Sequence, residues 1–474
     1  MESCVKSYLE QKGYTINTTA LEKIKMADDW YRNNELDFHR RTTVQGESFV
    51  MRRLGFAKRC CADDANLCEV IEINAGGAPG KNVKKKKSAN EEQNDAVNRI
   101  LNECRFNTQY RKQLEQTSAH GTVACYVRME GVTFMDDNSA NGGRIRLNYV
   151  TADCFIPLTV EDDVVKEAAF SGTALKKGKK RTTLVMFTLG EDKRYVAETH
   201  EFDENGKEIS EVEQVVQLGD VKPFAVMKIA EVNNLENMVG YGYPKVYNAI
   251  PIFEVLDLCF NALFGDLDKA DKLVLVNEVL CKFDANGKPI TPNKQLKKIF
   301  VMLGQKLPDQ KDVYQEYNPK IRIDELTKTF ELALSLMSLM FGYGTKKYSF
   351  ENGQIVTATE FVLSRQDQMQ ELNRQRQEAR EYISDICHAV IWFSNTYLKT
   401  NFDTSTEILV DFDDSLISDK ETEIQRRRDD ALSFDIPELL VWYLMDAYNL
   451  SETEAWKLVQ EKKEEPEVDD ETDD

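Results

Sequence analysis

Histidines and closely spaced cysteines are scarce in this sequence. Only four histidines occur among 474 residues, and they lie far apart in the chain. The 10 cysteines include no Cys-x-x-Cys pair, whereas a structural zinc site needs about four ligands at close spacing. Their irregular spacing in a long chain does not indicate a disulfide framework. We therefore expect no metal site and no bound cofactor, and reduced, mostly buried thiols.

Long apolar runs and several enzyme motifs are also missing. No apolar run approaches the roughly 18 residues needed to span a bilayer, and the first residues do not have the pattern of a signal peptide. The Gly-x-Ser-x-Gly motif of serine hydrolases is absent. Residues 76–81 are similar to a phosphate-binding loop, but Ala75 and Asn82 stand where that loop requires Gly and Ser or Thr. We expect synthesis in the cytoplasm, no membrane contact and no nucleotide site.

Positive charge is in deficit. There are 61 Lys and Arg against 81 Asp and Glu, which gives a formal net charge of −20. A monomer that wraps DNA with a basic face is therefore not expected, although loose contact with nucleic acid stays open. The apolar fraction of 42% and the charged fraction of 30% are typical of a soluble globular chain. A chain of this length has room for about two to four domains.

The first half of the chain changes from helical to β patterns. Residues 14–68 have a helical pattern, which predicts helices over 20–31 and 47–67. A strand is expected over 69–74, and a further helix over 90–117. From 121 to 218, short apolar runs separated by turn signals such as Gly178 and Asn205-Gly206 indicate an antiparallel β-rich region. The strands expected there are 122–129, 144–151, 165–172, 182–189 and 194–202.

Two long apolar helices enclose a small β insert in the second half. Residues 244–269 have apolar side chains every three or four positions, and Pro244 suits the first turn of a helix. Residues 323–341 repeat the helical pattern. Between them, 270–322 is expected to be β-like. The strands expected in this insert are 273–283 and 298–303.

A glycine-rich, aromatic and basic segment follows at 341–353. The capping box Thr357-Ala-Thr-Glu360 then begins a third helix that we expect to reach 399. Its middle, 366–380, is almost wholly polar, which suits a surface shared between subunits better than the core of a monomer. The rest of the chain is expected to contain a strand over 406–412, a helical module with a helix at 437–448, and a disordered acidic tail at 464–474.

Clustered carboxylates after the last strand are the main candidates for chemistry. Asp411, Asp413 and Asp414 could hold divalent ions for phosphoryl transfer. No histidine or lysine lies nearby in sequence to complete such a site, and acids beside a helix N-terminus are commonly capping partners. A metal-dependent nuclease or phosphotransferase stays open as an alternative function, as does a small-oligomer scaffold that binds protein partners.

Several short motifs occur in an order that resembles a known family. They are Leu54-Gly-Phe-Ala-Lys58, Ala62-Asp-Asp-Ala-Asn-Leu67, Tyr149-Val-Thr-Ala-Asp153, Gly240-Tyr-Gly-Tyr-Pro244, Thr357-Ala-Thr-Glu360 and Asp411-Phe-Asp-Asp-Ser415. These motifs, together with the order of helix, β insert and helix, resemble the portal proteins of tailed bacteriophages. The resemblance extends over nearly the whole chain. The resemblance is to the group found in phages of Gram-positive bacteria.

The resemblance implies an α+β portal-type fold. Such a fold has an α/β wing, two long stem helices flanking a small β-containing clip, a long wing helix and a helical C-terminal crown. The implied divisions are 1–243 for the wing, with N-terminal helices and a β-rich part, 244–269 for the first stem helix, 270–322 for the clip, 323–341 for the second stem helix, 342–356 for the tunnel loop, 357–412 for the long helix and wing strand, 413–463 for the crown and 464–474 for the tail.

The resemblance also implies a non-enzymatic ring of about twelve subunits at one capsid vertex of the virion. Double-stranded DNA would pass through it without sequence specificity, and an acidic chain suits this role because many phosphate contacts would hold the DNA. The implied partners are the terminase large subunit, the head–tail connector or adaptor, and the major capsid and scaffolding proteins. The implied tunnel-loop residues are Tyr343, Lys346, Lys347 and Tyr348 as DNA contacts and Gly342, Gly344 and Gly353 as hinges.

Overall fold

The structure, a computed structural model, divides into two units by the contacts within the chain. Unit 1 comprises Met1–Cys68 and Ile73–Val410, and unit 2 comprises Glu69–Glu72 and Asp411–Asp474. The described residues are 2–42, 46–77, 89–134, 140–141, 143–209, 214–268, 270, 273–277, 285–286, 300–303, 314–317, 320–344, 347–348, 366–413, 428–431, 433, 437–448, 450 and 455–460.

Unit 1 begins with short helices. They are α1 (Ser3–Gln11), α2 (Thr18–Tyr31), α3 (Phe56–Ala65), α4 (Ala89–Glu103) and α5 (Phe106–His120), with 3-10 turns at Asp37–His39, Asn66–Cys68 and Ala152–Cys154. Helix α2 begins where the side chain of Asn17 accepts a 3.0 Å hydrogen bond from the backbone N–H of Ala20. The helix predicted over 20–31 is confirmed. The helix predicted over 90–117 is two helices, because the chain turns at Arg105, whose φ is 54°.

The helix predicted over 47–67 was wrong in its first half. Only α3 is helical there, whereas Ser48–Val50 forms strand β2, which pairs antiparallel with β1 (Arg40–Thr42). The backbone N–H of Leu54 donates a 2.9 Å hydrogen bond to the carboxylate of Asp257 in a later helix. Tertiary contacts therefore satisfy a backbone donor that a longer helix would have satisfied itself.

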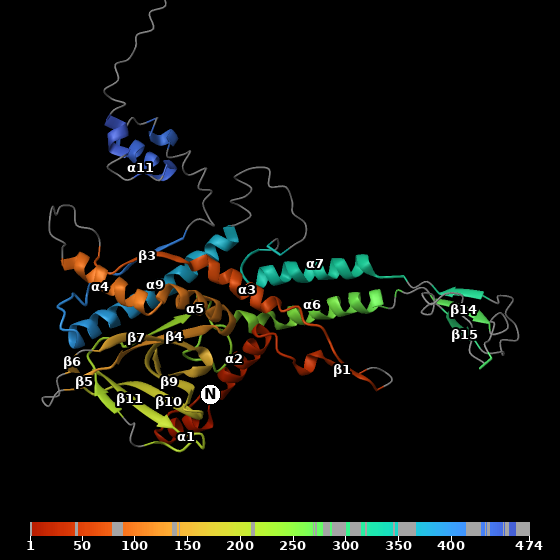
Figure 1. Cartoon of the computed structure of the whole chain (residues 1–474), viewed down its shortest axis with the longest axis horizontal. Helices are drawn as coiled ribbons and strands as arrows, with labels where there is room; N and C mark the ends of the chain where they lie inside the picture. Colours follow the sequence, from red (N-terminus) through yellow and green to blue (C-terminus); the bar gives the residue numbers. More distant parts are fainter. Residues whose placement is uncertain are drawn as a thin grey trace, which may run out of the picture. The chain divides into compact units, whose positions relative to one another are not determined.

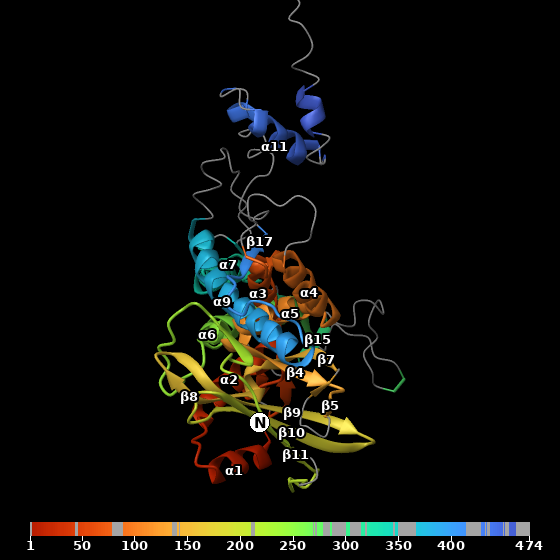
Figure 2. The ribbon, with the colours of Figure 1, turned by 90° about the vertical axis from the view of Figure 1, so that its left-hand side faces the viewer.

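Two antiparallel sheets form the body of unit 1 (Figures 1 and 2). One has the order β13-β4-β7 and the other the order β12-β11-β10-β9-β8. Their strands are β4 (Thr122–Glu130), β7 (Arg144–Thr151), β8 (Phe155–Glu161), β9 (Val164–Lys176), β10 (Lys179–Leu189), β11 (Tyr195–Phe202), β12 (Gln214–Gln217) and β13 (Phe224–Lys228); a hairpin, β5 (Thr133–Phe134) with β6 (Ala140–Asn141), stands apart. The β-rich region predicted over 121–218 is confirmed. It contains β8, β12 and the β5–β6 hairpin in addition to the five expected strands, and β13 follows it.

Aromatic side chains join the two sheets. The ring of Tyr126 in β4 lies 4.9 Å from that of Phe170 in β9, and the ring of Phe187 in β10 lies 5.9 Å from that of Phe224 in β13. Helices α5 and α9 (Gln366–Tyr397) pack on the β13-β4-β7 sheet. The core of unit 1 is thus a layer of helices on one sheet, with the second sheet behind it.

Helices α6 (Lys245–Asp268) and α7 (Ile323–Met340) pack side by side (Figure 1). The chain between them contains a three-stranded sheet of order β15-β14-β16, in which β14 pairs parallel with β15 and antiparallel with β16. These strands are β14 (Leu273–Asn277), β15 (Phe300–Leu303) and β16 (Tyr314–Tyr317). The predicted order of helix, β insert and helix is confirmed, with one strand more than expected.

Helices α6 and α7 expose many apolar side chains. Exposed fractions reach 51% at Leu267 in α6 and 61% at Leu332 in α7. The full set is Val255, Leu258, Phe264 and Leu267 in α6 and Ile323, Leu332, Leu336 and Leu339 in α7. Eight exposed apolar side chains on two neighbouring helices are typical of a protein–protein contact. No helix in the described part of the chain is long and apolar enough to span a membrane.

Unit 2 has a small helical core of its own. Helix α11 (Pro437–Tyr448), predicted from the sequence, packs with a helical turn at 455–460. Val441, Ala455 and Val459 are buried at this contact, with Leu440, Leu444, Met445 and Trp456 around them. The predicted strands at 69–74 and 406–412 are observed as β3 (Val70–Asn74) and β17 (Leu409–Phe412), which form a two-stranded sheet. The tail at 464–474 lies outside the described residues.

Candidate functional site

The segment after α7 folds back onto the protein. Gly342 and Gly344 have φ values of 79° and 68°, in the left-handed region that favours glycine. Between them, Tyr343 is only 5% exposed. Lys346 and Gly353, which were also predicted to belong to this site, lie outside the described residues.

Two tyrosine hydroxyls hold the segment against helix α3. The hydroxyl of Tyr343 donates to the carboxylate of Asp64, and that of Tyr348 donates to Asp63 Oδ2 at 3.0 Å. Lys347 is exposed, and its Nζ lies 4.5 Å from the ring centre of Tyr343, within the range of a cation–π contact. In this conformation Tyr343 faces the protein interior, so its predicted contact with DNA would require the segment to move away from α3.

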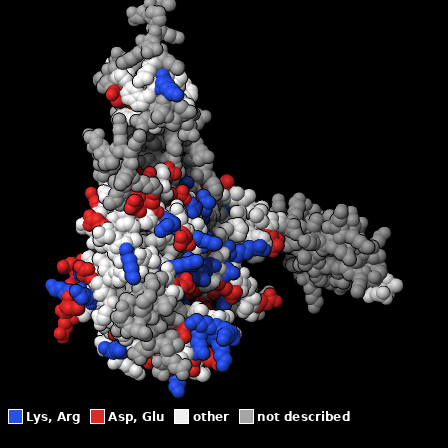
Figure 3. All heavy atoms as spheres, turned by 60° about the vertical axis from the view of Figure 1, so that its left-hand side comes forward, with Lys and Arg blue, Asp and Glu red and all other residues white. Residues whose placement is uncertain are grey.

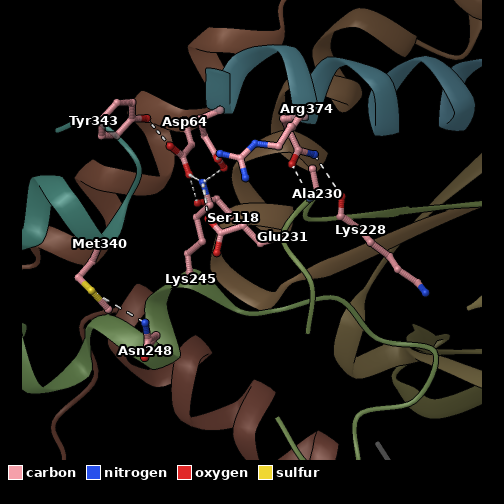
Figure 4. A network of polar contacts seen from close by, with 12 residues as sticks. Asp64, Ser118, Lys228, Ala230, Glu231, Lys245, Asn248, Met340, Tyr343 and Arg374 are labelled. Atoms are coloured by element: carbon pink, nitrogen blue, oxygen red, sulfur yellow. Dashed lines mark hydrogen bonds and ion pairs between the residues drawn. The ribbon is translucent and has the colours of Figure 1, made fainter. Parts of the chain in front are cut away.

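Beneath the segment lies a buried ionic network centred on Lys245, the first residue of α6 (Figure 4). Its Nζ lies 2.7 Å from Glu371 Oε1 in α9, 3.4 Å from Asp64 Oδ2 in α3 and 4.0 Å from Glu231 Oε1 after β13. The side chains of Lys245, Asp64 and Glu371 are 3%, 9% and 5% exposed. One ammonium group thus joins three elements that are far apart in sequence.

A hydrogen bond and a further ion pair fix the carboxylates of this network. The hydroxyl of Ser118 in α5 donates to Asp64 Oδ2 at 2.5 Å, and an Arg374 guanidinium nitrogen lies 3.3 Å from Glu371 Oε2. A cavity of about 20 Å³ lies beside Lys245 and is lined in part by Asp64, Ser118 and Glu371. A cavity of that volume accommodates about one water molecule and leaves no room for a substrate.

The surroundings of Lys245 and Tyr343 keep both side chains protonated. Burial lowers the pKa of Lys245, but Asp64 and Glu371 raise it more, so the net pKa is above its usual value and the ammonium stays protonated. Burial raises the pKa of Tyr343, and the carboxylate of Asp64 raises it further, so its hydroxyl stays a donor. A permanently charged lysine and a tyrosine that does not ionise can position a segment but cannot transfer protons near neutral pH.

Only a weak signal in the sequence indicates this network. Asp63 and Asp64 lie in the motif Ala62–Leu67, which resembles a family motif but does not by itself predict a buried ion pair. Lys245 is the only basic residue of the largely apolar helix α6, and a lysine in such a helix is seldom buried unless it is paired with an acid. The partner Glu371 lies in a helical stretch with many other charged residues, so nothing in the pattern distinguished it.

The carboxylates predicted as an alternative site do not form one among the described residues. Asp411 is exposed, the backbone N–H of Asp413 donates to the carbonyl of Glu69 at 2.8 Å, and Asp414 is not described. Within the described ranges, no group of three or more His, Cys, Asp or Glu side chains is placed to hold a metal ion.

Replacement of Tyr343 by Phe should loosen the segment after α7. The change removes the donor to a buried carboxylate, which costs about 1–3 kcal/mol locally. We expect faster hydrogen–deuterium exchange at 341–348, with α6 and α9 unchanged, measured by mass spectrometry. Tyr448→Phe, at a tyrosine that is 63% exposed in unit 2, is the control. Equal exchange in wild type and Tyr343→Phe would show that the hydroxyl does not hold the segment.

Comparison with known proteins assigns the chain to a family. The family model described as "Phage portal protein, SPP1 Gp6-like" matches residues 69–428, a span that includes α6, α7, the insert between them and the ionic network apart from α3. No curated protein matches the chain significantly. Among solved structures, it is similar to a chain titled "Neck of native GTA particle computed with C12 symmetry", with 10% sequence identity, a TM-score of 0.37, and coverage of 85% of this chain and 89% of that one. Because the family match covers more than half of the chain, the chain belongs to the SPP1 Gp6-like family of phage portal proteins.

Proposed function

We propose that the protein assembles into a ring of about twelve copies at one vertex of the phage capsid. Family membership makes the protein a portal protein and a component of the phage particle. The observation that supports a ring is the apolar surface of α6 and α7, which a monomer would leave in water. Packed between neighbouring copies, these two helices would line a channel through which double-stranded DNA passes during packaging and ejection.

The proposed roles of the segments follow the family resemblance. Helices α6 and α7 are the stem, and the β14–β16 sheet between them is the clip, which docks the terminase large subunit and later the head–tail connector or adaptor. Residues 1–243, with the long helix and strand of 357–412, form the wing, and 413–463 forms the crown. The wing would contact the major capsid protein and, during assembly, the scaffolding protein.

We propose that the protein is structural, as portal proteins generally are, and has no catalytic activity. The ATP hydrolysis that drives packaging would belong to the separate terminase. The segment after α7 is the tunnel loop, with Lys346 and Lys347 as sparse DNA contacts in an acidic chain. Because phosphate contacts strengthen binding and make it dependent on salt, few such contacts favour sliding. The Tyr343–Asp64 and Tyr348–Asp63 hydrogen bonds would hold this loop against α3 when it is not in contact with DNA.

A single charge on α7 should test the ring. The side chain of Leu332 is 61% exposed in the isolated chain, and burial of a glutamate between subunits is strongly unfavourable. We expect wild type to give rings of about a dozen copies by native mass spectrometry and negative-stain imaging, and Leu332→Glu to give monomers. The matched control is Val215→Glu in β12, at a valine that is 58% exposed. Rings from Leu332→Glu would contradict the proposed stem contact, and a monomeric wild type would contradict the ring.

Charge reversal in the tunnel loop should alter DNA retention. We expect phages with Lys346→Glu and Lys347→Glu to package or retain less DNA, because the reversed charges repel phosphates at the narrowest part of the channel. The measurement is the amount of nuclease-protected DNA per particle at two salt concentrations. Reversal of Lys193, an exposed lysine in the turn after β10, is the control. Unchanged packaging and retention would mean that these lysines do not contact the DNA.

A further inference from the structure

The turn between β9 and β10 concentrates positive charge in an acidic chain. Of the six residues 176–181, five are basic: Lys176, Lys177, Lys179, Lys180 and Arg181. The four lysines are exposed, and the neighbouring Leu175 is 78% exposed. We name 175–181 the basic hairpin tip. Figure 3 shows that Lys and Arg side chains on the face it displays gather in groups rather than spreading evenly.

Part of this charge has no partner in the same copy. Lys176 pairs with Glu201, and Lys180 Nζ lies 2.8 Å from Glu2 Oε1. Among the described residues, Lys177 and Lys179 form no ion pair. The basic hairpin tip therefore presents two free ammonium groups beside an exposed leucine.

A groove of about 730 Å³ has the opposite charge. It lies between the turn before β9, the chain after β13 and one face of α9. Six carboxylates line it: Asp162, Asp163, Glu231, Glu378, Glu381 and Asp385. Its two lysines are already paired, Lys222 with Asp385 at 2.5 Å and Lys228 with Asp163 at 2.8 Å. We name this surface the acidic groove.

The acidic groove also exposes apolar side chains and unneutralised charge. Val232 and Val239 on its wall are 90% and 70% exposed. Burial raises the pKa of Glu378, and the nearby carboxylate of Glu381 raises it further, although Lys228 opposes this shift, as expected where negative charges outnumber positive ones. The groove thus offers both carboxylates for lysines and an apolar surface for Leu175.

Within one copy the two surfaces cannot meet. The turn at 162–163 precedes β9 and lines the acidic groove, whereas the basic hairpin tip lies at the opposite end of the same strand. At about 3.3 Å per residue, the 13 residues of β9 separate them by about 40 Å. β9 is paired on both sides within its sheet, which keeps this separation fixed.

We propose that the basic hairpin tip of one copy docks into the acidic groove of the next copy. Two different surfaces that fit each other form a head-to-tail contact, and such contacts close into a ring when the rotation between copies allows it. The opposite charges would set the order of the subunits, and Leu175 packing against Val232 and Val239 would add apolar contact. This inference rests on the proposed ring, and it assigns one contact between wings in addition to that between stems.

Zero-length crosslinking tests the contact directly. A carbodiimide joins a lysine amine to a carboxylate only when the two groups touch. We expect joined peptides that link Lys177 or Lys179 to Asp162 or Glu381, and the length of β9 makes these links intermolecular. The pairs Lys180–Glu2 and Lys222–Asp385 exist within one copy and serve as positive controls. If assembled protein yields only such internal links, the proposal is overturned.

A charge swap provides the second test. Lys177→Glu with Lys179→Glu, and separately Asp162→Lys with Glu381→Lys, should each raise the protein concentration needed for ring assembly at least tenfold. All four changes together should restore assembly, an effect that a folding defect would not produce. The control is Lys193→Glu with Lys207→Glu, which makes the same change of charge at two other exposed turns of this sheet; Lys193, with φ of 61°, matches Lys177, with φ of 51°.

The outcomes separate this proposal from the ring and from DNA binding. A wild type that forms no rings contradicts both the proposed function and this contact. Normal assembly of every variant leaves the ring intact and overturns the contact alone. If the tip variant assembles normally but binds a DNA duplex more weakly, the basic hairpin tip is a DNA contact and the proposal is wrong.

Discussion

Lys245→Met should lower the free energy of unfolding by about 3–5 kcal/mol, because it leaves the buried carboxylates of Glu371 and Asp64 without their shared counter-charge. Methionine has nearly the volume of lysine, so the loss comes from charge rather than from a cavity. The measurement is urea-induced unfolding of unassembled protein near pH 7. The pKa of Lys245 is raised in the folded state, so its stabilising effect is complete below its unfolded pKa of about 10.5 and is lost as the pH rises through the folded value.

Two further variants make this prediction specific. Lys6→Met removes a lysine whose pair with Glu10 is 3.8 Å long and largely exposed, and it should cost less than about 1 kcal/mol. Lys245→Met combined with Glu371→Gln should recover part of the lost stability, because one unpaired buried charge is removed. If Lys245→Met costs no more than Lys6→Met, the network does not stabilise the junction of α3, α6 and α9.

Gly242→Ala should cost about 3 kcal/mol by forcing two backbone segments apart. A Cβ at Gly242 would lie 2.2 Å from the carbonyl oxygen of Gly121, and a Cβ at Gly121 would lie 2.4 Å from the carbonyl oxygen of Gly242. The N–H of Gly242 also donates a 2.7 Å hydrogen bond to Thr122 Oγ1. Because α6 begins three residues later, the shift should also displace Lys245 from its carboxylates.

The matched control for this change is a glycine with free space around it. Gly265 lies inside α6, and a Cβ added there would have no neighbour within 4 Å. Gly265→Ala should therefore stabilise the unassembled protein by about 0.5–1 kcal/mol, because alanine favours a helix. Urea unfolding of both variants measures the difference. Similar stabilities for Gly242→Ala and wild type would show that the two segments can separate without cost.

Most of the architecture could be predicted from the sequence because it depends on local periodicity. Apolar residues every three or four positions predicted α6 and α7, and turn signals such as Gly178 predicted the hairpins of the large sheet. The prediction failed at 47–55, where apolar spacing was helical but the backbone donor of Leu54 bonds to Asp257, about 200 residues later. A local pattern of residues cannot show that a backbone N–H will bond to an acceptor so distant in the sequence.

The sequence by itself determined the portal-type order of elements, the acidic balance and the position of the segment after α7, since each depends on composition or local pattern. Only the tertiary structure decided what that segment contacts: Tyr343 and Tyr348 bond to two adjacent carboxylates of α3, and Lys245 joins α3, α6 and α9. The strength of an ion pair depends on distance and burial. Both are set when residues 64, 245 and 371 come together in space, and neither can be read from their separate places in the chain.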